Sequence, residues 1–537
     1  MDRFWNWNSC LEKITNWGVP MVTLRFILLS LVMATLTQLI YTKRAMANID
    51  YLPNQSANYL MNPIRIGSTE GADIANFNPA GTAFMKDGIH FDVSVQSITV
   101  SYSGMEYKGK TYGSNEPVPA IPNAYFVFKK GRWSLFASFT IPAGGGTRHY
   151  KDGIPMLDEN CPKVSDQAQD IIFEQAHKGL AEKAHMSVTE YWLAPTIRSI
   201  IGSDFFNPND PSIDFNSMKY VEQHLDFSNT KVDWLGGEVK GSSMYLAGTI
   251  GTAYQIIEKV FATSFSIRYI YAKNEYSGWT KYRITPVAVS DGCMVADQIA
   301  DEVNNPANIT TELVELDASK EAHGIGAIIG LHWRPVESLN IGLRYESQTV
   351  LSWKESVKDG KSFAGMFVDG RRRSYNLPSL VGLGIEWSPT GWLAVGIQGH
   401  YYFVKLADSY SDEGGEILGY NDNYSDAWDG QFGLKLKPFD WLEFGAGTAY
   451  YYGGANKKTY SDLDAQIPCV SISGGIKITP FKCLSLTGSG GYLHYFPKRN
   501  AAGNKRYIQK NIAFAVGVEY RYLFDTSDSR NEVNLPK

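Results

Sequence analysis

The chain has 537 residues, of which 44% are hydrophobic, and its formal net charge is −5. This composition excludes a bundle of membrane helices, because each such helix needs about 20 consecutive apolar residues and only residues 26–40 approach that length. The mild acidity and the lack of a basic stripe in the sequence argue against a nucleic-acid partner. The chain contains 50 Gly, 32 Tyr, 26 Phe and 13 Trp, which is typical of β-rich proteins with aromatic side chains at an interface.

Residues 1–47 are predicted to form a signal peptide. Arg25 precedes the apolar segment 26–40, and Ala45 and Ala47 have the small-x-small spacing of a cleavage site. The alternative is a single membrane anchor. Export would place the rest of the chain outside the cytoplasm.

The mature chain is expected to begin at Asn48, and the long polar extension before Met21 indicates that translation starts at Met21. Cys161 and Cys293 lie in loop-like segments, where an oxidising compartment permits a disulfide. The cysteine spacing predicts no metal site.

From residue 89 onward, the sequence alternates between two kinds of side chain. In the last segment, Val516 and Val518 belong to a continuous bulky set, whereas Gly517 and Glu519 belong to a small or charged set. Successive strand side chains point to opposite faces, so one whole face is bulky and apolar. A soluble sandwich would bury that face in a core, whereas a membrane barrel turns it toward lipid and keeps polar groups in its lumen.

Six tight turns are expected, and each joins two strands of the ~9–11 residues that cross a bilayer. These turns are at 129–132, 258–259, 335–338, 388–391, 438–440 and 480–481. With one strand before and one after these hairpins, the total is about fourteen, an even number as in bacterial barrels. We therefore predict an all-β fold, a transmembrane antiparallel β-barrel. The barrel is expected at 89–524, with its two longest extracellular loops at 151–241 and 278–320. A polar periplasmic tail is expected at 525–537.

Residues 48–88 are rich in Asn, Ala, Gly and Pro and lack sustained alternation. About fourteen strands enclose a lumen too wide for the side chains of the wall to fill. We expect this segment to lie inside the barrel as a hatch.

Several charged residues occupy strand positions with the lumen-facing parity. This fits a barrel in lipid, because an Arg or Lys facing lipid at mid-depth would cost ~2–4 kcal/mol. We expect them to pair with one another and with the hatch, and one of the basic residues is a candidate partner for a substrate carboxylate. They are Arg268, Arg344, Glu346, Asp429, Lys435, Glu519 and Arg521.

Gly324, Gly326 and Gly330 superficially resemble a dinucleotide-binding motif, but they share one parity within a strand and lack a βαβ context. We interpret them as thin lumen-facing positions. The nine histidines are scattered and no nucleophile–base–acid arrangement stands out. The sequence therefore predicts neither an enzyme nor a cofactor.

Asn78, Pro79 and Ala80 precede the first expected strand. In kind and position they resemble the Asn-Pro-Ala hatch motif of the FadL family of outer-membrane transporters for fatty acids and other hydrophobic compounds. Residues 343–347 resemble the family's Tyr-Arg-Ser strand, and Leu377-Pro378 its Leu-Pro strand start. The expected strand count and loop alternation agree with this family over nearly the whole mature chain.

The resemblance implies a route for a hydrophobic ligand. Outer loops capture it, a lumenal pocket binds it, and hatch movement opens a way to a lateral gap at a kink in the third strand. Gly144, Gly145 and Gly146 are the candidates for this kink. The candidates for holding a ligand head group are Lys273, which resembles the family's basic residue on strand five, together with Arg268 and Arg344.

The sequence also departs from the family. The family usually ends at an aromatic residue, whereas here a polar tail follows Phe524. Lys273 has the lipid-side parity. The loop at 151–241 is longer than usual, so the resemblance does not predict the outer binding groove or the identity of its ligand.

We therefore expect passive transport of hydrophobic small molecules, such as long-chain fatty acids, across the outer membrane of a Gram-negative bacterium. The barrel is expected to be a monomer in contact with membrane lipid and lipopolysaccharide. The alternative is a receptor or adhesion barrel that binds haem or a macromolecule through its large loops, with the hatch as a permanent seal.

Overall fold

The computed structural model describes most of the expected barrel. The described residues are 56–159, 161, 225–290, 300–301, 303–362, 367–407, 409–411, 424–462 and 465–524. The expected signal peptide, residues 48–55, most of the loop at 151–241 and the tail at 525–537 lie outside them. The expected boundaries at those positions therefore stay predictions.

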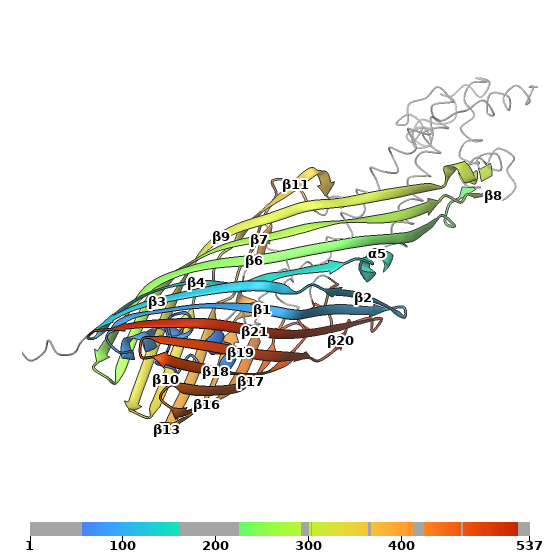
Figure 1. Cartoon of the computed structure of the whole chain (residues 1–537). Helices are drawn as coiled ribbons and strands as arrows, with labels where there is room; N and C mark the ends of the chain where they lie inside the picture. The colour runs from blue at the N-terminus through green and yellow to red at the C-terminus, as the bar shows by residue number, and fades with distance from the viewer. Residues whose placement is uncertain are drawn as a thin grey trace, which may run out of the picture.

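Fourteen antiparallel strands form one closed wall, in which each strand pairs with its neighbours along the chain and the last strand pairs with the first (Figure 1). The closing ladder runs from the Gly88–Leu523 pair to the Tyr107–Lys505 pair. The wall strands are β1 (Gly88–Tyr107), β3 (Val118–Lys130), β4 (Trp133–Tyr150), β6 (Lys231–Ile257), β7 (Phe261–Thr285), β9 (Thr310–Val336), β10 (Leu339–Glu346), β13 (Leu380–Thr390), β14 (Leu393–Tyr402), β16 (Ala427–Phe439), β17 (Leu442–Tyr452), β18 (Cys469–Phe481), β19 (Leu484–Tyr495) and β21 (Lys505–Leu523). The predicted fold class is confirmed.

Short strands extend this wall or lie beside it. β10 continues after an interruption as β11, and β12 precedes β13 after a second interruption. The additional elements are β2 (Lys110–Asn115), β11 (Ser352–Ser362), β12 (Arg372–Tyr375), β15 (Ser409–Ser411), β20 (Lys498–Arg499), the separate pair β5 (Leu225–Asp226) and β8 (Val289–Ser290), α5 (Pro155–Glu159), η3 (Pro306–Asn308) and η4 (Val404–Leu406).

The two faces of the wall differ as the alternation predicted. On β21, Val516 and Tyr522 are 65% and 57% exposed, whereas Ala515 and Glu519 are 3% exposed. Bulky apolar side chains on the outside and small or charged ones inside are the pattern of a barrel in lipid. No helix among the described residues is long and apolar enough to span a bilayer.

Three neighbouring strands are much longer than the others. β6 and β9 each have 27 residues and β7 has 25, whereas about 9–11 residues cross a bilayer. These strands run together well beyond the rest of the wall (Figure 1). The inner face of this extension packs on α5 through Leu157 and Tyr282, which belong to one buried apolar cluster.

The described part of the N-terminal segment, residues 56–87, lies inside the barrel. It contains α3 (Ala57–Met61), α4 (Ile74–Phe77) and η1 (Pro79–Phe84), and nearly all of its side chains are buried. Asn58 donates to Asp92 of β1 at 2.9 Å, and Ser489 of β19 donates to the carbonyl oxygen of Ala57 at 2.9 Å. Hydrogen bonds to strands from both ends of the chain therefore hold the segment in the lumen.

A buried ion pair organises this segment internally. Arg65 pairs with Asp73, and the Asp73 carboxylate also accepts from Ser56 at 2.6 Å. Because a buried charge is costly unless it is paired and hydrogen-bonded, this network favours one compact arrangement of a segment that has little regular structure.

The wall is thin where it meets the segment. Gly342 of β10 faces inward, and a Cβ atom there would overlap the carbonyl oxygen of Ile66. Gly330 of β9 lies against Asn78 in the same way. These contacts explain why glycines occupy lumen-facing positions of two adjacent strands.

Candidate functional site

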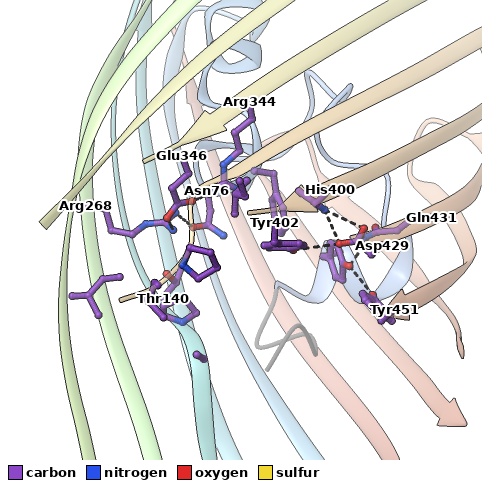
Figure 2. A pocket seen from close by; sticks show the side chains of 18 residues that line it. Asn76, Thr140, Arg268, Arg344, Glu346, His400, Tyr402, Asp429, Gln431 and Tyr451 are labelled. Atoms are coloured by element: carbon purple, nitrogen blue, oxygen red, sulfur yellow. Dashed lines mark hydrogen bonds and ion pairs between the residues drawn. The ribbon is translucent and has the colours of Figure 1, made fainter. Parts of the chain in front are cut away.

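A cavity of about 120 Å³ lies in the lumen between the N-terminal segment and the wall (Figure 2). Tyr59, Asn76 and Phe77 of the segment form one side of it. The wall contributes side chains from β4, β7, β10, β13, β14, β16 and β17 and from the interruption between β12 and β13. The wall residues are Thr140, Pro142, Ala143, Arg268, Ile270, Arg344, Glu346, Leu377, Pro378, Leu380, His400, Tyr402, Asp429, Gln431 and Tyr451.

One side of the cavity carries two guanidinium groups that share one carboxylate. Arg268 lies 2.6 Å from a Glu346 oxygen, and Arg344 contacts the other oxygen. Arg268 also donates to Thr249 at 3.2 Å and to Asn76 of the N-terminal segment at 3.1 Å. We call Arg268, Arg344 and Glu346 the arginine cluster. Its position follows from strand parity, which turns all three side chains inward.

The other side carries a buried carboxylate with three donors. Nδ1 of His400 lies 3.0 Å from Asp429, and Tyr402 and Gln431 donate to the same carboxylate at 3.2 and 2.8 Å. We call His400, Tyr402, Asp429 and Gln431 the aspartate cluster. His400 and Asp429 are register partners on β14 and β16, so the antiparallel ladder itself places them face to face.

The aspartate cluster connects to the N-terminal segment through a chain of amides. Gln431 accepts from Gln398 at 2.8 Å, and Gln398 accepts from the backbone N–H groups of Arg65 and Ile66 at 2.8 and 2.9 Å. The carboxylate at the cavity is therefore three hydrogen bonds away from the backbone of the segment.

A tyrosine pair adds a second connection. The hydroxyls of Tyr59 and Tyr451 lie 3.0 Å apart, and the ring of Tyr59 stacks on Phe77 with 5.2 Å between centroids. Burial, together with the charge of Asp429, raises the pKa of Tyr59, so this phenol stays neutral and protonated.

The cavity also borders an irregular part of β4. Register shifts between Thr140 and Ala143 and between Gly144 and Gly146 interrupt the β4–β6 ladder. Gly144 has φ of +68°, and a Cβ atom there would lie 2.5 Å from the Ser243 carbonyl oxygen. Bulges bend a strand and leave a residue out of the ladder. The three candidate glycines therefore lie at the register shifts of the third wall strand, directly after the cavity residues Thr140, Pro142 and Ala143.

The backbone pairing of β3 with β4 ends near these register shifts. Among the described residues, the β3–β4 ladder runs from the turn only as far as the Ala124–Phe139 pair. Beyond it, Val118 and Ile121 of β3 and Ile141 of β4 form a buried apolar cluster. Apolar side-chain packing therefore joins the two strands past the end of their ladder.

The residues of the expected hatch motif lie where α4 ends and η1 begins. Asn78 is fully buried and donates to the carbonyl oxygens of Ile66 and Leu331 at 3.0 and 3.1 Å. Pro79 occupies the first turn of η1, where its missing N–H has no cost. Ala80 is fully buried.

The structure does not bring all the head-group candidates together. Arg268 and Arg344 meet at the cavity, but Lys273 lies on the outer face, where it pairs with Glu275 and Glu321 at 2.8 and 3.8 Å. Lys273 has an odd number on β7, like the exposed Tyr269, and odd-numbered side chains on this strand point away from the lumen. Lys273 is therefore not a cavity residue.

The disulfide between Cys161 and Cys293 stays a prediction, because Cys293 lies outside the described residues. Cys161 is buried in the apolar cluster at the base of the extended strands.

Sequence reasoning missed His400, Tyr402 and Gln398. All three have even numbers on β14, where Gln398 is buried in the lumen and His400 and Tyr402 are half-buried. The signal was available in the alternation, since these positions alternate with Tyr401 and Ile397 on the lipid side. What the sequence could not show was which residue of β16 lies opposite each of them.

Solved structures supply the comparison with known proteins. The toluene transporter TodX of Pseudomonas putida aligns with a TM-score of 0.50 and 12% identity, covering 89% of this chain and 100% of that one. The chain has the FadL-type barrel fold. The toluene transporter TbuX of Ralstonia pickettii (TM-score 0.49, 13% identity, 88% and 99% covered) and a FadL homologue of Pseudomonas aeruginosa (0.48, 15%, 88% and 99%) also align. No family model matches the sequence, and no curated protein matches it significantly. The FadL-type relationship therefore rests on the fold.

Proposed function

We propose that this protein is an outer-membrane channel that passively transports small, mainly hydrophobic molecules through the lumenal cavity. The observation that carries the proposal is that one cavity borders both the N-terminal segment and the bulged part of β4. A ligand in that cavity lies beside the N-terminal segment and near the point where the β3–β4 ladder ends. TodX is a toluene transporter with this fold, which supports a small ligand with an aromatic ring.

In the proposed route, residues 48–88 act as a hatch and the bulge at Gly144–Gly146 is the kink of a lateral exit. Ligands enter from the loops, bind in the cavity and leave sideways between β3 and β4 once the apolar cluster of Val118, Ile121 and Ile141 shifts. Lateral release needs no energy source, because burial of apolar surface in the membrane is favourable at about 0.8 kcal/mol per methylene. Membrane lipid and lipopolysaccharide would surround a monomeric barrel.

The size of the cavity favours a small ligand. An engineered protein cavity of about 150 Å³ accommodates benzene, whereas drug-sized ligands occupy pockets of about 300–1,000 Å³. A cavity of about 120 Å³ therefore suits a single ring or a short chain in this conformation. Transport of a long-chain fatty acid would need the hatch to move first.

A cavity-filling variant tests the proposal. Ala143 is 2% exposed and lines the cavity, so Ala143→Trp should fill much of it and lower the uptake of labelled toluene at least about tenfold. Val516→Trp, on the lipid side of β21, is the matched control and should transport normally. Heat-dependent electrophoretic mobility would confirm that both barrels fold. Normal uptake by a folded Ala143→Trp barrel would refute transport through this cavity.

A further inference from the structure

We propose that the preferred ligand is a small aromatic acid with a hydroxyl group at its far end, rather than a pure hydrocarbon or a fatty acid. This inference rests on the proposed function and specifies its substrate class. Figure 2 shows the arginine cluster and the aspartate cluster on opposite sides of the pocket. The cavity thus offers two different polar ends to one ligand.

The arginine cluster carries an excess positive charge. Arg268 and Arg344 contribute two positive charges and Glu346 one negative charge, and all three side chains are at least nine-tenths buried. Most of the donors of Arg268 are engaged by Glu346, Thr249 and Asn76. Arg344 has one partner among the described residues, Glu346. A ligand carboxylate beside Arg344 would neutralise the remaining charge, and charge-assisted hydrogen bonds of this kind are strong.

The aspartate cluster has the opposite character. Asp429 is 5% exposed and lines the cavity, so this end already presents a carboxyl group and is a poor place for a ligand carboxylate. Asp429 contacts Nδ1 of His400, and because a carboxylate accepts hydrogen bonds, Nε2 is the ring nitrogen left to accept from a ligand. A ligand hydroxyl can donate to that nitrogen.

The surfaces between the two clusters are apolar. Phe77, Pro142, Ile270, Leu377 and Pro378 line the cavity and suit the faces and edges of a ring. A carboxylate at one end, a ring in the middle and a hydroxyl at the far end would match all three parts of the site. A site built to bind a polar group rejects ligands that lack it, because its own buried groups then stay unpaired.

Equilibrium dialysis of the full-length barrel in detergent against radiolabelled 4-hydroxybenzoate, benzoate, phenol and toluene tests this assignment. We expect 4-hydroxybenzoate to bind at least about tenfold more tightly than benzoate or phenol, since each polar end contributes a hydrogen bond to a charged or oriented group. Toluene should bind most weakly. Toluene binding equal to or tighter than that of 4-hydroxybenzoate overturns the inference while leaving the proposed transport intact. If none of the four probes binds or is taken up, the proposed function itself fails.

Variants assign the two ends. Arg344→Met should bring the affinity for 4-hydroxybenzoate close to that for phenol, and His400→Leu should bring it close to that for benzoate. Lys273→Met, on the outer face, is the control and should bind all probes normally. An equal loss for every probe in both folded variants would contradict the assignment of the ends. The wild-type comparison decides the ligand class even if a variant fails to fold.

Discussion

The side-chain amide of Asn78 donates to the carbonyl oxygen of Leu331 on β9 at 3.1 Å. The same amide donates to Ile66 within the N-terminal segment at 3.0 Å. One side chain therefore joins two parts of the segment to each other and to the wall, at a place where Gly330 and Gly342 allow close approach. If the segment moves as a hatch, this contact must break.

Replacing Asn78 by Ala should loosen the segment. Two buried carbonyl groups lose their donor, at a cost of about 1–3 kcal/mol each if water does not replace it. We expect a lower unfolding temperature and faster passive entry of small solutes in liposome swelling. Asn504→Ala, in an exposed turn, should change neither property. Unchanged swelling with Asn78→Ala would show that this contact does not control access.

Gly144→Ala should impair release more than binding. The residue has positive φ, and its Cβ atom would approach the Ser243 carbonyl oxygen at 2.5 Å, so the bulge must rearrange at a cost of about 1–3 kcal/mol. We expect uptake to fall severalfold while the affinity of the cavity changes by less than about twofold. Gly503→Ala has a similar φ of +73° but open space around it and is the matched control. Equal effects of the two substitutions on uptake would argue against a special role for the bulge.

Gln398 is expected to couple the cavity to the segment. It accepts from the N–H groups of Arg65 and Ile66 and donates to Gln431, so Gln398→Leu removes the connection without reducing side-chain volume much. Hydrogen exchange at the amides of residues 65 and 66 should accelerate at least about tenfold, because these donors lose their acceptor. Exchange within the β16–β17 ladder should stay slow. Unchanged exchange at residues 65 and 66 would exclude Gln398 as their main acceptor in solution.

The sequence predicted the barrel well because a strand that faces lipid on one side carries a strict period of two. The parity of Val516 and Glu519 determined both faces, and the same argument placed Arg268 and Arg344 in the lumen and Lys273 outside. The site was harder to predict, because its residues come from strands far apart in the chain. The His400–Asp429 contact depends on the register of β14 with β16, which alternation alone does not specify. The contacts of Asn78 depend on an irregular segment, for which the sequence has no periodic signal.

Glu70 gives a pH-dependent test of how the segment is held. It lies 3.0 Å from Lys435 and 2.7 Å from Lys437 of β16, and Lys435, together with Lys437, holds the pKa of Glu70 well below its ordinary value. A carboxyl group with a lowered pKa stabilises the fold fully above its ordinary pKa of about 4.3. This stabilisation is lost only as the pH falls through the lower value in the folded protein.

Glu70→Gln should therefore lower the unfolding temperature by the same small amount at pH 5 and pH 8, where Glu70 is charged in both folded and unfolded chains. The contribution is expected to be at most about 1 kcal/mol, because the Glu70 side chain is 54% exposed and partly exposed ion pairs are weak. Below about pH 4 the difference between variant and wild type should shrink. Glu258→Gln, which removes an exposed pair with Arg132 at the turn between β6 and β7, should show almost no difference at any pH. A difference that varies between pH 5 and 8, or that grows as the pH falls below 4, would contradict an anchoring carboxylate with a lowered pKa.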